Sequence, residues 1–506
     1  MNGLARVSPT TLAGTEFDLA IVGAGINGAA IARDAAFRGL SVLVVDKADV
    51  GSGTSSWSSR LIHGGLRYLE QFEFRLVAEA LAEREILLGI ARHLVWPARF
   101  VMPHVPELRP RWMIRAGLFL YDHLARRASL PASHAVRLDI PPYSSGLKPQ
   151  FHHGFIYSDC RVDDARLVIS NAMDARQRGA EILTRTECTA ARRDGRVWRI
   201  TLGDGREICA RAIVNAAGPW VKQVLDARLG QHDDDRVRLV KGSHIVLPQL
   251  YQGDHAFILQ NDDGRVVFMI PYGDRHTLVG TTDVPLQGDP GEVRASDAEV
   301  EYLCRAASRY LQQPVEPAQV VWSYAGVRPL HDDGSNNPSA ITRDYTLRVD
   351  DEGGAAPVLS IYGGKVTTYR RLAEQAMQRL AAYFPVLGRD WTATQPLPGA
   401  DFGTQGRERA RDVLFGQYRH LSQDMLRGVF RRHGTLAYRV LEGATSVDDL
   451  GRNFGAGLYA REVDWFIDQE WAVSGEDVLW RRTKCGLQLT DMQRKAVTDY
   501  VKQRAS

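Results

Sequence analysis

The segment FDLAIVGAGINGAAIARDAAFRGLSVLVVDK, residues 17–47, decides the fold of this chain. Its apolar run over 17–22 predicts a strand that is buried on both faces of a parallel sheet. Glycines in the pattern G-x-G-x-x-G follow, and apolar residues at helical spacing then lead to Gly39, where a helix would end. A second apolar run over 41–45 predicts the next strand, and Asp46 comes directly after it. The segment therefore predicts a βαβ unit of the dinucleotide-binding type.

Each part of this unit has a mechanical role in binding a dinucleotide. Gly23 permits a tight turn, Gly25 lets a pyrophosphate approach the backbone, and Gly28 allows the helix to pack closely on the strand. The helix N-terminus faces the phosphates. Asp46 is placed to accept hydrogen bonds from ribose hydroxyls, and an acid there argues against the 2′-phosphate of NADP. The cofactor residues predicted in this unit are Gly23, Ala24, Gly25, Ile26, Asn27, Gly28 and Asp46.

The polar segment TSSWSSRLIHGGLRYLEQ, residues 54–71, is either a mobile Ser/Gly linker or a loop that wraps a phosphorylated or heteroaromatic ligand. An NAD enzyme would normally continue into another βαβ repeat, whereas FAD carries an isoalloxazine that must be led away from the adenosine. A Ser/Gly loop after the second strand suits that task and favours FAD. The cofactor residues predicted in the loop are Thr54, Ser55, Ser59, His63, Gly64 and Gly65. Whether His63 is linked covalently to FAD stays open.

The middle of the chain alternates helical and strand patterns. Residues 73–91 predict a helix by their periodicity, and the prolines within 96–110 indicate a loop. Residues 165–186 predict a helix that ends at Gly179 and a strand after it. Short alternating runs between 238 and 285 predict an antiparallel sheet, so we expect a second domain to be inserted there.

Two strand–turn–helix segments supply further cofactor residues. The strand within 212–225 ends in small residues, where the backbone can approach a cofactor. In 360–384 a Gly-Gly turn precedes a helix that Thr367 and Thr368 are expected to cap. The positive potential of that helix terminus would stabilise the negative charge of reduced flavin near N1, although an ordinary strand–turn–helix is the alternative. The cofactor residues predicted here are Ala217, Gly218, Gly364, Val366 and Thr367.

The segment RPRWMIRAGLFLYDHLARR, residues 109–127, combines an apolar face with five arginines. One interpretation is a helix packed on the body of the protein, with its arginines in water. The other is an interfacial helix that is held to anionic lipid. After residues 394–399 the composition is helical and charged, which predicts a separate C-terminal domain with Trp465, Trp471 and Trp480 as core anchors.

The length and amino-acid composition of the chain are those of an ordinary soluble globular protein. Its 506 residues predict two or three domains, with 44% hydrophobic and 24% charged residues. The net charge of +3 gives no argument for nucleic acid. The five cysteines are odd in number and form no C-x-x-C pair, which favours a reducing compartment and no zinc or other metal. We expect no secretory signal, membrane-spanning helix or internal repeat.

The chain resembles the FAD-dependent glycerol-3-phosphate dehydrogenases of the respiratory, quinone-reducing kind. The most specific runs are GINGA, SSRLIHGGLRYLE and GGKVTTYR, and the resemblance extends from residue 17 to the C-terminus. Two features depart from the pattern of the family. One is an N-terminal extension of roughly 16 residues, and the other is Arg60, where relatives are expected to carry lysine.

The resemblance implies an α/β + α fold, with a glutathione-reductase-like Rossmann FAD domain, an inserted antiparallel-sheet substrate domain and a C-terminal helical domain. It implies oxidation of sn-glycerol 3-phosphate to dihydroxyacetone phosphate, with hydride moving from C2 to flavin N5 and electrons passing to ubiquinone. It also implies a homodimer that is peripheral on the cytoplasmic face of the inner membrane. The predicted ranges are 1–16 for the extension, 17–95, 150–230 and 320–388 for the FAD domain, 96–149 and 231–319 for the substrate-binding, membrane-facing domain, and 389–506 for the helical domain.

The phosphate of such a substrate is a dianion, so its site needs arginines with bidentate reach. Most arginines in this chain are expected to lie in water, but the resemblance implies a pocket-lining role for a few residues. The predicted substrate residues are Arg67, Tyr68, Arg328, Arg343 and Lys365. We assign removal of the hydroxyl proton to His244, with Lys365 stabilising the developing alkoxide. Arg328 completes the predicted catalytic set, and the alternative for His244 is a hydrogen-bonded strand histidine.

Two other kinds of function fit the same residues. A same-fold oxidase that acts on glycerol 3-phosphate or on an amino acid would pass its electrons to oxygen. A flavin-binding regulator or membrane-docking protein would have no turnover. The arginines favour a phosphorylated alcohol over an amino acid, and the joint presence of Arg67, His244, Arg328 and Lys365 argues for turnover. We expect cofactor contact to end, and substrate contact to begin, between Gly65 and Arg67.

Overall fold

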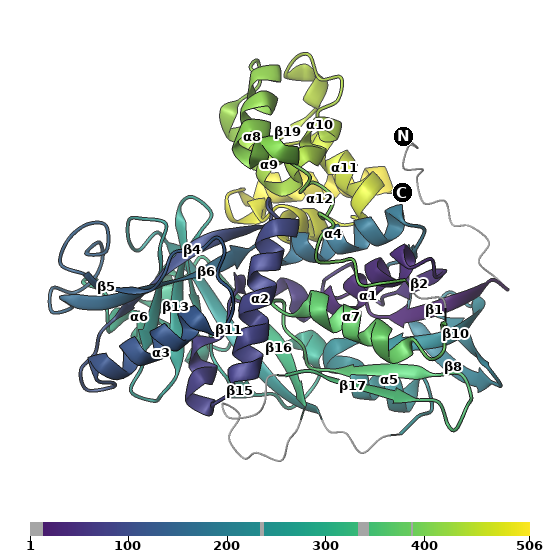
Figure 1. Ribbon diagram of the computed structural model, residues 1–506. Coiled ribbons are helices and arrows are strands. Elements are labelled where there is room, and N and C mark those ends of the chain that lie inside the picture. The colour runs from purple at the N-terminus through teal and green to yellow at the C-terminus, as the bar shows by residue number, and fades with distance from the viewer. Residues whose placement is uncertain (1–13, 233–236, 332–343, 386–387, 506) are drawn as a thin grey trace.

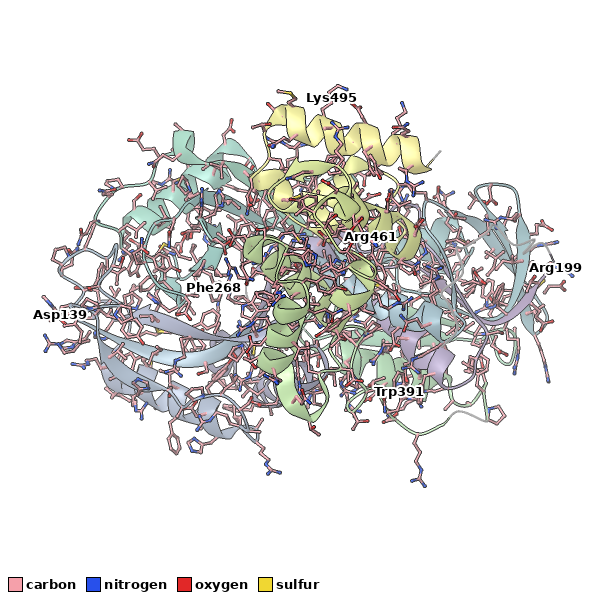
Figure 2. All side chains as sticks on the ribbon, turned by 90° about the horizontal axis from the view of Figure 1, so that it is seen from above. Asp139, Arg199, Phe268, Trp391, Arg461 and Lys495 are labelled. Carbon is pink, nitrogen blue, oxygen red and sulfur yellow. The ribbon has the colours of Figure 1, made fainter. Side chains whose placement is uncertain are left out.

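A computed structural model describes residues 14–232, 237–331, 344–385 and 388–505 (Figure 1). Two large sheets lie side by side in it, and the C-terminal helices stand over one edge of the pair. Seen from above, the C-terminal helices, which carry Arg461 and Lys495, lie in front of the two sheets (Figure 2). No helix in the described ranges has the length and apolarity to cross a bilayer. Within the same ranges, no group of His, Cys, Asp and Glu side chains could hold a metal ion.

The first sheet is built on a parallel core. Strand β1 (Glu16–Val22) lies between β10 (Glu207–Asn215) and β2 (Val42–Val45) and is parallel to both. The order β17-β18-β10-β1-β2-β7 continues outward, and β8 and β9 attach through β10. The other strands of this sheet are β7 (Glu181–Leu183), β8 (Cys188–Asp194), β9 (Val197–Leu202), β17 (Thr346–Asp350) and β18 (Val358–Tyr362).

The predicted βαβ unit is present, because helix α1 (Ile26–Phe37) joins β1 to β2. Helices α4 (Asp164–Gln177) and α7 (Tyr369–Leu380) pack on α1 and share a buried apolar core with it. A Cβ added at Gly28 would lie 1.9 Å from the carbonyl oxygen of Gly23. Only glycine therefore allows the helix to pack this close to the strand end, as the motif predicts.

The second sheet has ten strands in the order β15-β11-β14-β13-β12-β4-β6-β3, with β16 beside β11 and β5 beside β6. Neighbouring strands are antiparallel except β12 and β4, so the predicted antiparallel sheet is confirmed with one parallel pair. Its strands are β3 (Leu61–Ile62), β4 (Val95–Pro103), β5 (His134–Arg137), β6 (His153–Val162), β11 (Val237–Pro248), β12 (Ala256–Gln260), β13 (Val266–Tyr272), β14 (His276–Gly280), β15 (Val284–Pro285) and β16 (Trp322–His331).

Strand β4 corrects the loop that was predicted over 96–110. Its partner β12 contacts it only at Phe100 and Val101, whereas β6 runs along its whole length. Pro97 and Pro103 therefore lie where the strand has a neighbour on one side only. A proline is tolerated there because its missing N–H would otherwise point away from the ladder.

The predicted domain ranges differ from the sheets at two places. Strand β6 lies in the range 150–230 and β16 in the range 320–388, both assigned to the FAD domain, yet both belong to the second sheet. Strand β16 belongs to the second sheet because it pairs with β11 along its whole length, from Val237 opposite His331 to Val246 opposite Trp322. Two strands so far apart in the chain carry no local sequence pattern that would show that they pair. The other boundaries stay predictions.

Helix α2 (Phe74–Ile90) confirms the helix that was predicted over 73–91. The remaining helices of the two-sheet body are α3 (Arg111–His123), α5 (Val221–Ala227) and α6 (Asp297–Ser308). The C-terminal elements are α8 (Gly406–Gln417), α9 (Gln423–His433), α10 (Ala437–Val440), β19 (Asn453–Gly455), β20 (Leu458–Tyr459), α11 (Ala460–Glu470) and α12 (Asp491–Ala505). Short helical turns are η1 (Thr54–Ser56), η2 (Leu66–Gln71), η3 (Gly218–Trp220), η4 (Pro290–Glu292), η5 (Pro317–Gln319), η6 (Gly403–Gln405), η7 (Gly434–Leu436), η8 (Asp448–Leu450), η9 (Asp477–Arg482) and η10 (Cys485–Leu487).

The three tryptophans expected to anchor the C-terminal core are only partly buried. Trp480 stacks on Trp322 of β16 with ring centroids 4.7 Å apart, and Trp471 packs against the core around α1. Phe454 and Phe466 are instead fully buried among the C-terminal helices. Trp465 and Trp480 do pack against the core of the C-terminal helices, as predicted, whereas Trp471 lies at the boundary with the rest of the chain.

Candidate active site

A cavity of about 1340 Å³ lies where the two sheets and the C-terminal domain meet. Its walls come from the β1–α1 junction, the loop after β2, the paired strands β11 and β16, and the turn before α7. Most of the predicted site residues line it. They are Gly23, Gly25, Ile26, Asn27, Asp46, Thr54, Ser55, Ser59, His63, Gly65, Arg67, Tyr68, Ala217, Gly218, His244, Arg328, Gly364, Lys365, Val366 and Thr367.

Four predicted residues do not line the cavity or cannot be placed. Ala24 and Gly28 lie behind its wall and shape the β1–α1 turn. Gly64 faces away from it, because its amide donates to the Tyr121 hydroxyl at 2.8 Å and a Cβ there would lie 2.4 Å from Leu81. The backbone of Gly64 was expected to lie close to the cofactor, but it lies close to the side chains of Leu81 and Tyr121 instead. Arg343 lies outside the described residues.

The end of the cavity at the α1 N-terminus is arranged around Asp46. Its carboxylate accepts hydrogen bonds from the amides of Ala24 at 2.7 Å and Ala48 at 2.8 Å. Burial raises the pKa of this carboxyl group, and the two amide donors oppose the rise. The carboxylate is therefore fixed in orientation beside the helix N-terminus, where a ribose and a diphosphate would lie side by side.

The loop 54–71 is tied to the site by hydrogen bonds at its start and is not a free linker. The Ser55 hydroxyl accepts a hydrogen bond from the amide of Ile26 at 3.0 Å, and Thr54 donates to the carbonyl of Val327 at 2.6 Å. Gly65 then adopts φ of +77°, in the left-handed region that glycine favours. The turn η2 follows and places Arg67 and Tyr68 in the cavity wall.

His244 lies on β11 with its imidazole almost fully buried. Its Nε2 is 2.9 Å from the Ser59 hydroxyl, and its ring stacks on Tyr324 at 4.8 Å between centroids. The opposite face of the ring lies against Gly280, where a Cβ would come within 2.1 Å. Among the described residues, Nδ1 has no hydrogen-bond partner. The imidazole is therefore held rigidly at the cavity wall with unused hydrogen-bonding capacity.

The surroundings of His244 disfavour its protonated form. Burial, followed by the positive charges of Arg328 and Arg60, lowers the pKa of His244 to about 3. This differs from the expected group near neutrality, because burial of the imidazole, and then the positive charges of Arg328 and Arg60, disfavour its protonated form. The ring is neutral at pH 7 and able to accept a proton, but it is a weak base until a ligand offsets these positive charges.

Arg328 is held by partners that the sequence did not indicate. Its Nη1 donates to Asp283 at 2.7 Å, and its Nη2 donates to the Thr281 hydroxyl at 3.1 Å. Both partners follow directly after β14, which lies beside β11. The guanidinium is therefore oriented in the cavity wall before any ligand binds.

The turn before α7 brings the chain back to the β1–α1 junction. Gly364 has φ of +106°, and a Cβ there would lie 2.9 Å from the side-chain amide of Asn27. That amide donates to the carbonyl of Gly363 at 3.4 Å, while Asn27 Oδ1 is buried with no partner among the described residues. The ammonium of Lys365 lies 4.2 Å from the centre of the Tyr68 ring.

The predicted threonine caps of α7 are not formed. Thr368 is the N-cap residue but makes no side-chain hydrogen bond to the helix. Thr367 instead accepts a hydrogen bond from the amide of His63 at 3.3 Å and so joins the turn to the loop 54–71. The helix terminus therefore has no side-chain acceptor of its own, which leaves its positive potential available to a ligand.

This arrangement fits a flavin dinucleotide. The α1 terminus and Asp46 suit a diphosphate and a ribose, and the uncapped α7 terminus suits an electron-rich ring. The orphaned Asn27 Oδ1 lies between the two ends and supplies a buried acceptor. An acceptor in that position suits a ring N–H, so the donor and acceptor set matches the cofactor predicted from the sequence.

Comparisons with known proteins agree with this fit. The sequence model of the FAD dependent oxidoreductase family matches residues 18–370, and that of the C-terminal domain of alpha-glycerophosphate oxidase matches residues 391–504. A glycerol-3-phosphate dehydrogenase of Pseudomonas aeruginosa is 52% identical over 489 residues, covering 96% of this chain and 95% of that protein. A D-erythritol 1-phosphate dehydrogenase of Brucella abortus is 46% identical over 488 residues, covering 96% of this chain and 97% of that protein.

A solved structure shares the fold. It is the glycerol-3-phosphate dehydrogenase of Bacillus halodurans in complex with FAD, with a TM-score of 0.73 and 24% identity, covering 98% of this chain and 95% of that one. The predicted fold class and the predicted cofactor are thereby confirmed. The chain belongs to the family of FAD-dependent oxidoreductases that includes the glycerol-3-phosphate dehydrogenases.

Proposed function

We propose that the protein oxidises sn-glycerol 3-phosphate to dihydroxyacetone phosphate and passes the electrons to a membrane quinone such as ubiquinone. The observation that carries this proposal is that three cations, Arg67, Arg328 and Lys365, line the same cavity as the buried imidazole of His244. A phosphate dianion is the ligand that such a group binds best. The names of the relatives support a phosphorylated polyol, since both substrates end in a phosphate.

The two arginines have different roles in this proposal. Among the described residues Arg67 makes no ion pair, so its guanidinium is available to the phosphate. Arg328 forms an ion pair with Asp283, which orients its guanidinium. The negative charge of Asp283 also weakens the attraction of Arg328 for a phosphate. One fixed and one adaptable arginine would together bind the dianion from two sides.

The chemistry of the chain follows from the placement of these groups. When bound, FAD supplies the acceptor for the hydride that leaves C2 of the substrate. His244 accepts the hydroxyl proton, and the positive charge of Lys365 stabilises the alkoxide while it forms. The two negative charges of a phosphate at Arg328 would offset one of the cations that depress the pKa of His244. Substrate binding would therefore make the imidazole a better base.

A second candidate is an oxidase of the same fold, and the match of residues 391–504 to a domain of alpha-glycerophosphate oxidase favours it. The two functions differ in the acceptor that reoxidises the flavin. We expect substrate-reduced protein to be reoxidised much faster by a soluble ubiquinone analogue than by air-saturated buffer, with little peroxide. Rapid reoxidation by oxygen with one peroxide per flavin would identify the oxidase instead.

Helix α3 supports contact with a membrane surface. Its buried side, with Ile114 and Leu118, packs on the body of the protein, so the first interpretation of 109–127 describes that side. The other side carries large apolar residues in water, with Trp112 70% exposed and Phe119 56% exposed. Met113 and Leu120 are exposed beside them, and arginines flank the helix. An exposed aromatic face with cationic flanks is suited to anionic lipid.

The homodimer and the cytoplasmic face of the inner membrane remain part of this proposal through the family resemblance alone.

Replacing both Trp112 and Phe119 by glutamine should weaken binding to vesicles of phosphatidylcholine and phosphatidylglycerol by roughly tenfold or more, because two large apolar side chains no longer enter the lipid interface. Co-sedimentation at a fixed lipid concentration measures the effect. Met492→Gln is a matched control, since Met492 is 80% exposed on α12. If the double variant sediments like the parent protein, α3 is not the membrane contact.

A further inference from the structure

One end of the cavity is closed by the C-terminal domain. Ser474, Glu476, Asp477 and Arg481 line the cavity together with Asp46. These four residues belong to η9 and the turn before it, more than four hundred positions further along the chain. Helix α4 lies beneath the C-terminal helices in Figure 1, and it contacts both α11 and η9. The wall formed by Ser474–Arg481 is therefore docked on the FAD domain and not loosely attached to it.

A buried ion network joins this wall to the segment that follows β2. Arg481 Nε lies 2.6 Å from Asp49 Oδ2, and Arg482 Nη2 lies 2.9 Å from Asp49 Oδ1. All three side chains are buried, with Asp49 2% exposed and Arg482 fully enclosed. Asp49 is three positions after Asp46, whose carboxylate lies at the α1 N-terminus. The C-terminal domain thus binds the same short segment that is proposed to hold the ribose.

A second connection runs through Asp477. Its carboxylate accepts hydrogen bonds from the amides of Val473 at 2.9 Å and Ser474 at 3.0 Å, and it pairs with Arg185 at 2.6 Å and with Arg481. Burial opposes its charge, but Arg482 and Arg481 hold the pKa of Asp477 at about 2. The amide of Arg185 in turn donates to the carbonyl of Ala48 at 2.9 Å. The C-terminal domain is therefore connected to residues 46–49 twice, through Asp49 directly and through Arg185.

Buried ion pairs contribute little net stability, because the desolvation of two charges offsets most of their attraction. In some proteins such pairs instead fix one geometry among several, since each charge tolerates few alternative partners. Here that geometry positions a wall of the cavity against Asp46. A network whose only task was to attach the domain would not need to reach a residue that lines the cavity, as Asp49, Asp477, Arg185 and Arg481 all do.

We propose that the C-terminal domain is part of the FAD site, with Ser474–Arg481 closing over the adenosine half of the cofactor. Arg481 and Arg482 act as positioning residues that hold the segment 46–49 through Asp49. The inference rests on the placement of the ribose at Asp46 under the proposed function. It assigns to this domain a role in retaining the cofactor, separate from any role in oxidising the substrate.

Titration of the apoprotein with FAD and, by competition, with ADP tests this role. ADP contains the adenosine and the diphosphate but no flavin. We expect Arg481→Gln to raise the dissociation constants of FAD and ADP by the same factor, roughly tenfold to a hundredfold, because Asp49 and Asp477 each lose one of their guanidinium partners. Arg185→Gln should have a smaller effect in the same direction, since Arg185 is 36% exposed and its loss is tolerated better by the fold. Arg481→Lys should restore part of the affinity.

The control is Lys495→Gln, which removes an exposed ion pair with Asp499 on the outer edge of the C-terminal domain (Figure 2). Its affinities should equal those of the parent, and the melting temperature of each apoprotein shows whether its fold is intact. Unchanged FAD affinity in both Arg481→Gln and Arg185→Gln would overturn the proposal. Loss of FAD affinity without loss of ADP affinity would also overturn it, because the wall would then act at the flavin half. No glycerol 3-phosphate is present, so a wrong substrate assignment leaves the result unaffected.

Discussion

Arg328→Ala should raise the KM for glycerol 3-phosphate by roughly a hundredfold or more while FAD stays bound. The arginine would lose its charge-assisted hydrogen bonds to the phosphate, which are the strongest kind available to a side chain. The change would also leave the Asp283 carboxylate, now paired with Arg328 at 2.7 Å, unpaired in the cavity wall, where it would repel the dianion. Both effects act on substrate binding, so the steady-state KM measures them together.

A matched control separates this effect from the general loss of an arginine. Arg199 on β9 pairs with Asp194 at the surface, far from the cavity lining, and Arg199→Ala should leave KM unchanged. Flavin absorbance of the purified Arg328→Ala protein shows whether the cofactor site is intact. If the variant has the parent KM with FAD bound, Arg328 does not contact the substrate.

His244→Ala should reduce the rate of flavin reduction in single turnover by roughly a hundredfold to ten-thousandfold, the usual contribution of a positioned general base. Binding of FAD and of substrate should persist, because His244 contributes no charge at pH 7 with its pKa lowered to about 3 by burial and by Arg328 and Arg60. The Ser59 hydroxyl would lose its partner at 2.9 Å, which is a small change beside the loss of the proton acceptor. Stopped-flow absorbance under anaerobic conditions measures the step directly.

His276→Ala is the corresponding control, since His276 lies on β14 of the same sheet but outside the cavity lining. Its rate of flavin reduction should equal that of the parent protein. An unchanged rate in His244→Ala would remove the base assignment and leave the alternative, in which His244 is a hydrogen-bonded strand histidine that supports Tyr324 by stacking.

Those parts of the site that depend on short stretches of sequence were predictable. The β1–α1 junction is one, because the spacing of Gly23, Gly25 and Gly28 is set by local contacts such as that between Gly28 and the Gly23 carbonyl. The turn at Gly364 is another, since a Gly-Gly pair between a strand pattern and a helix pattern predicts it, and Gly364 adopts the positive φ that glycine permits. Such patterns encode backbone geometry, which chain neighbours determine.

Other parts depend on contacts between distant segments and have no local signature. Asp283 orients Arg328 from the connection between β14 and β15, and a pairing of two residues 45 positions apart cannot be predicted from either local sequence. Gly64 was expected to approach the cofactor, but the packing of Leu81 from α2 takes up that space. The wall around Arg481 is the extreme case, because its partner Asp49 is separated from it by most of the chain.

The most direct test of the central claim is anaerobic addition of glycerol 3-phosphate to the purified holoenzyme. We expect the yellow flavin absorbance to bleach fully and dihydroxyacetone phosphate to form in a ratio of about one per flavin, since each flavin takes up one hydride. Glycerol, which lacks the phosphate that Arg67 and Arg328 are proposed to bind, should leave the colour unchanged over the same time. A flavin that stays oxidised with glycerol 3-phosphate, or that bleaches equally with glycerol, would contradict the account.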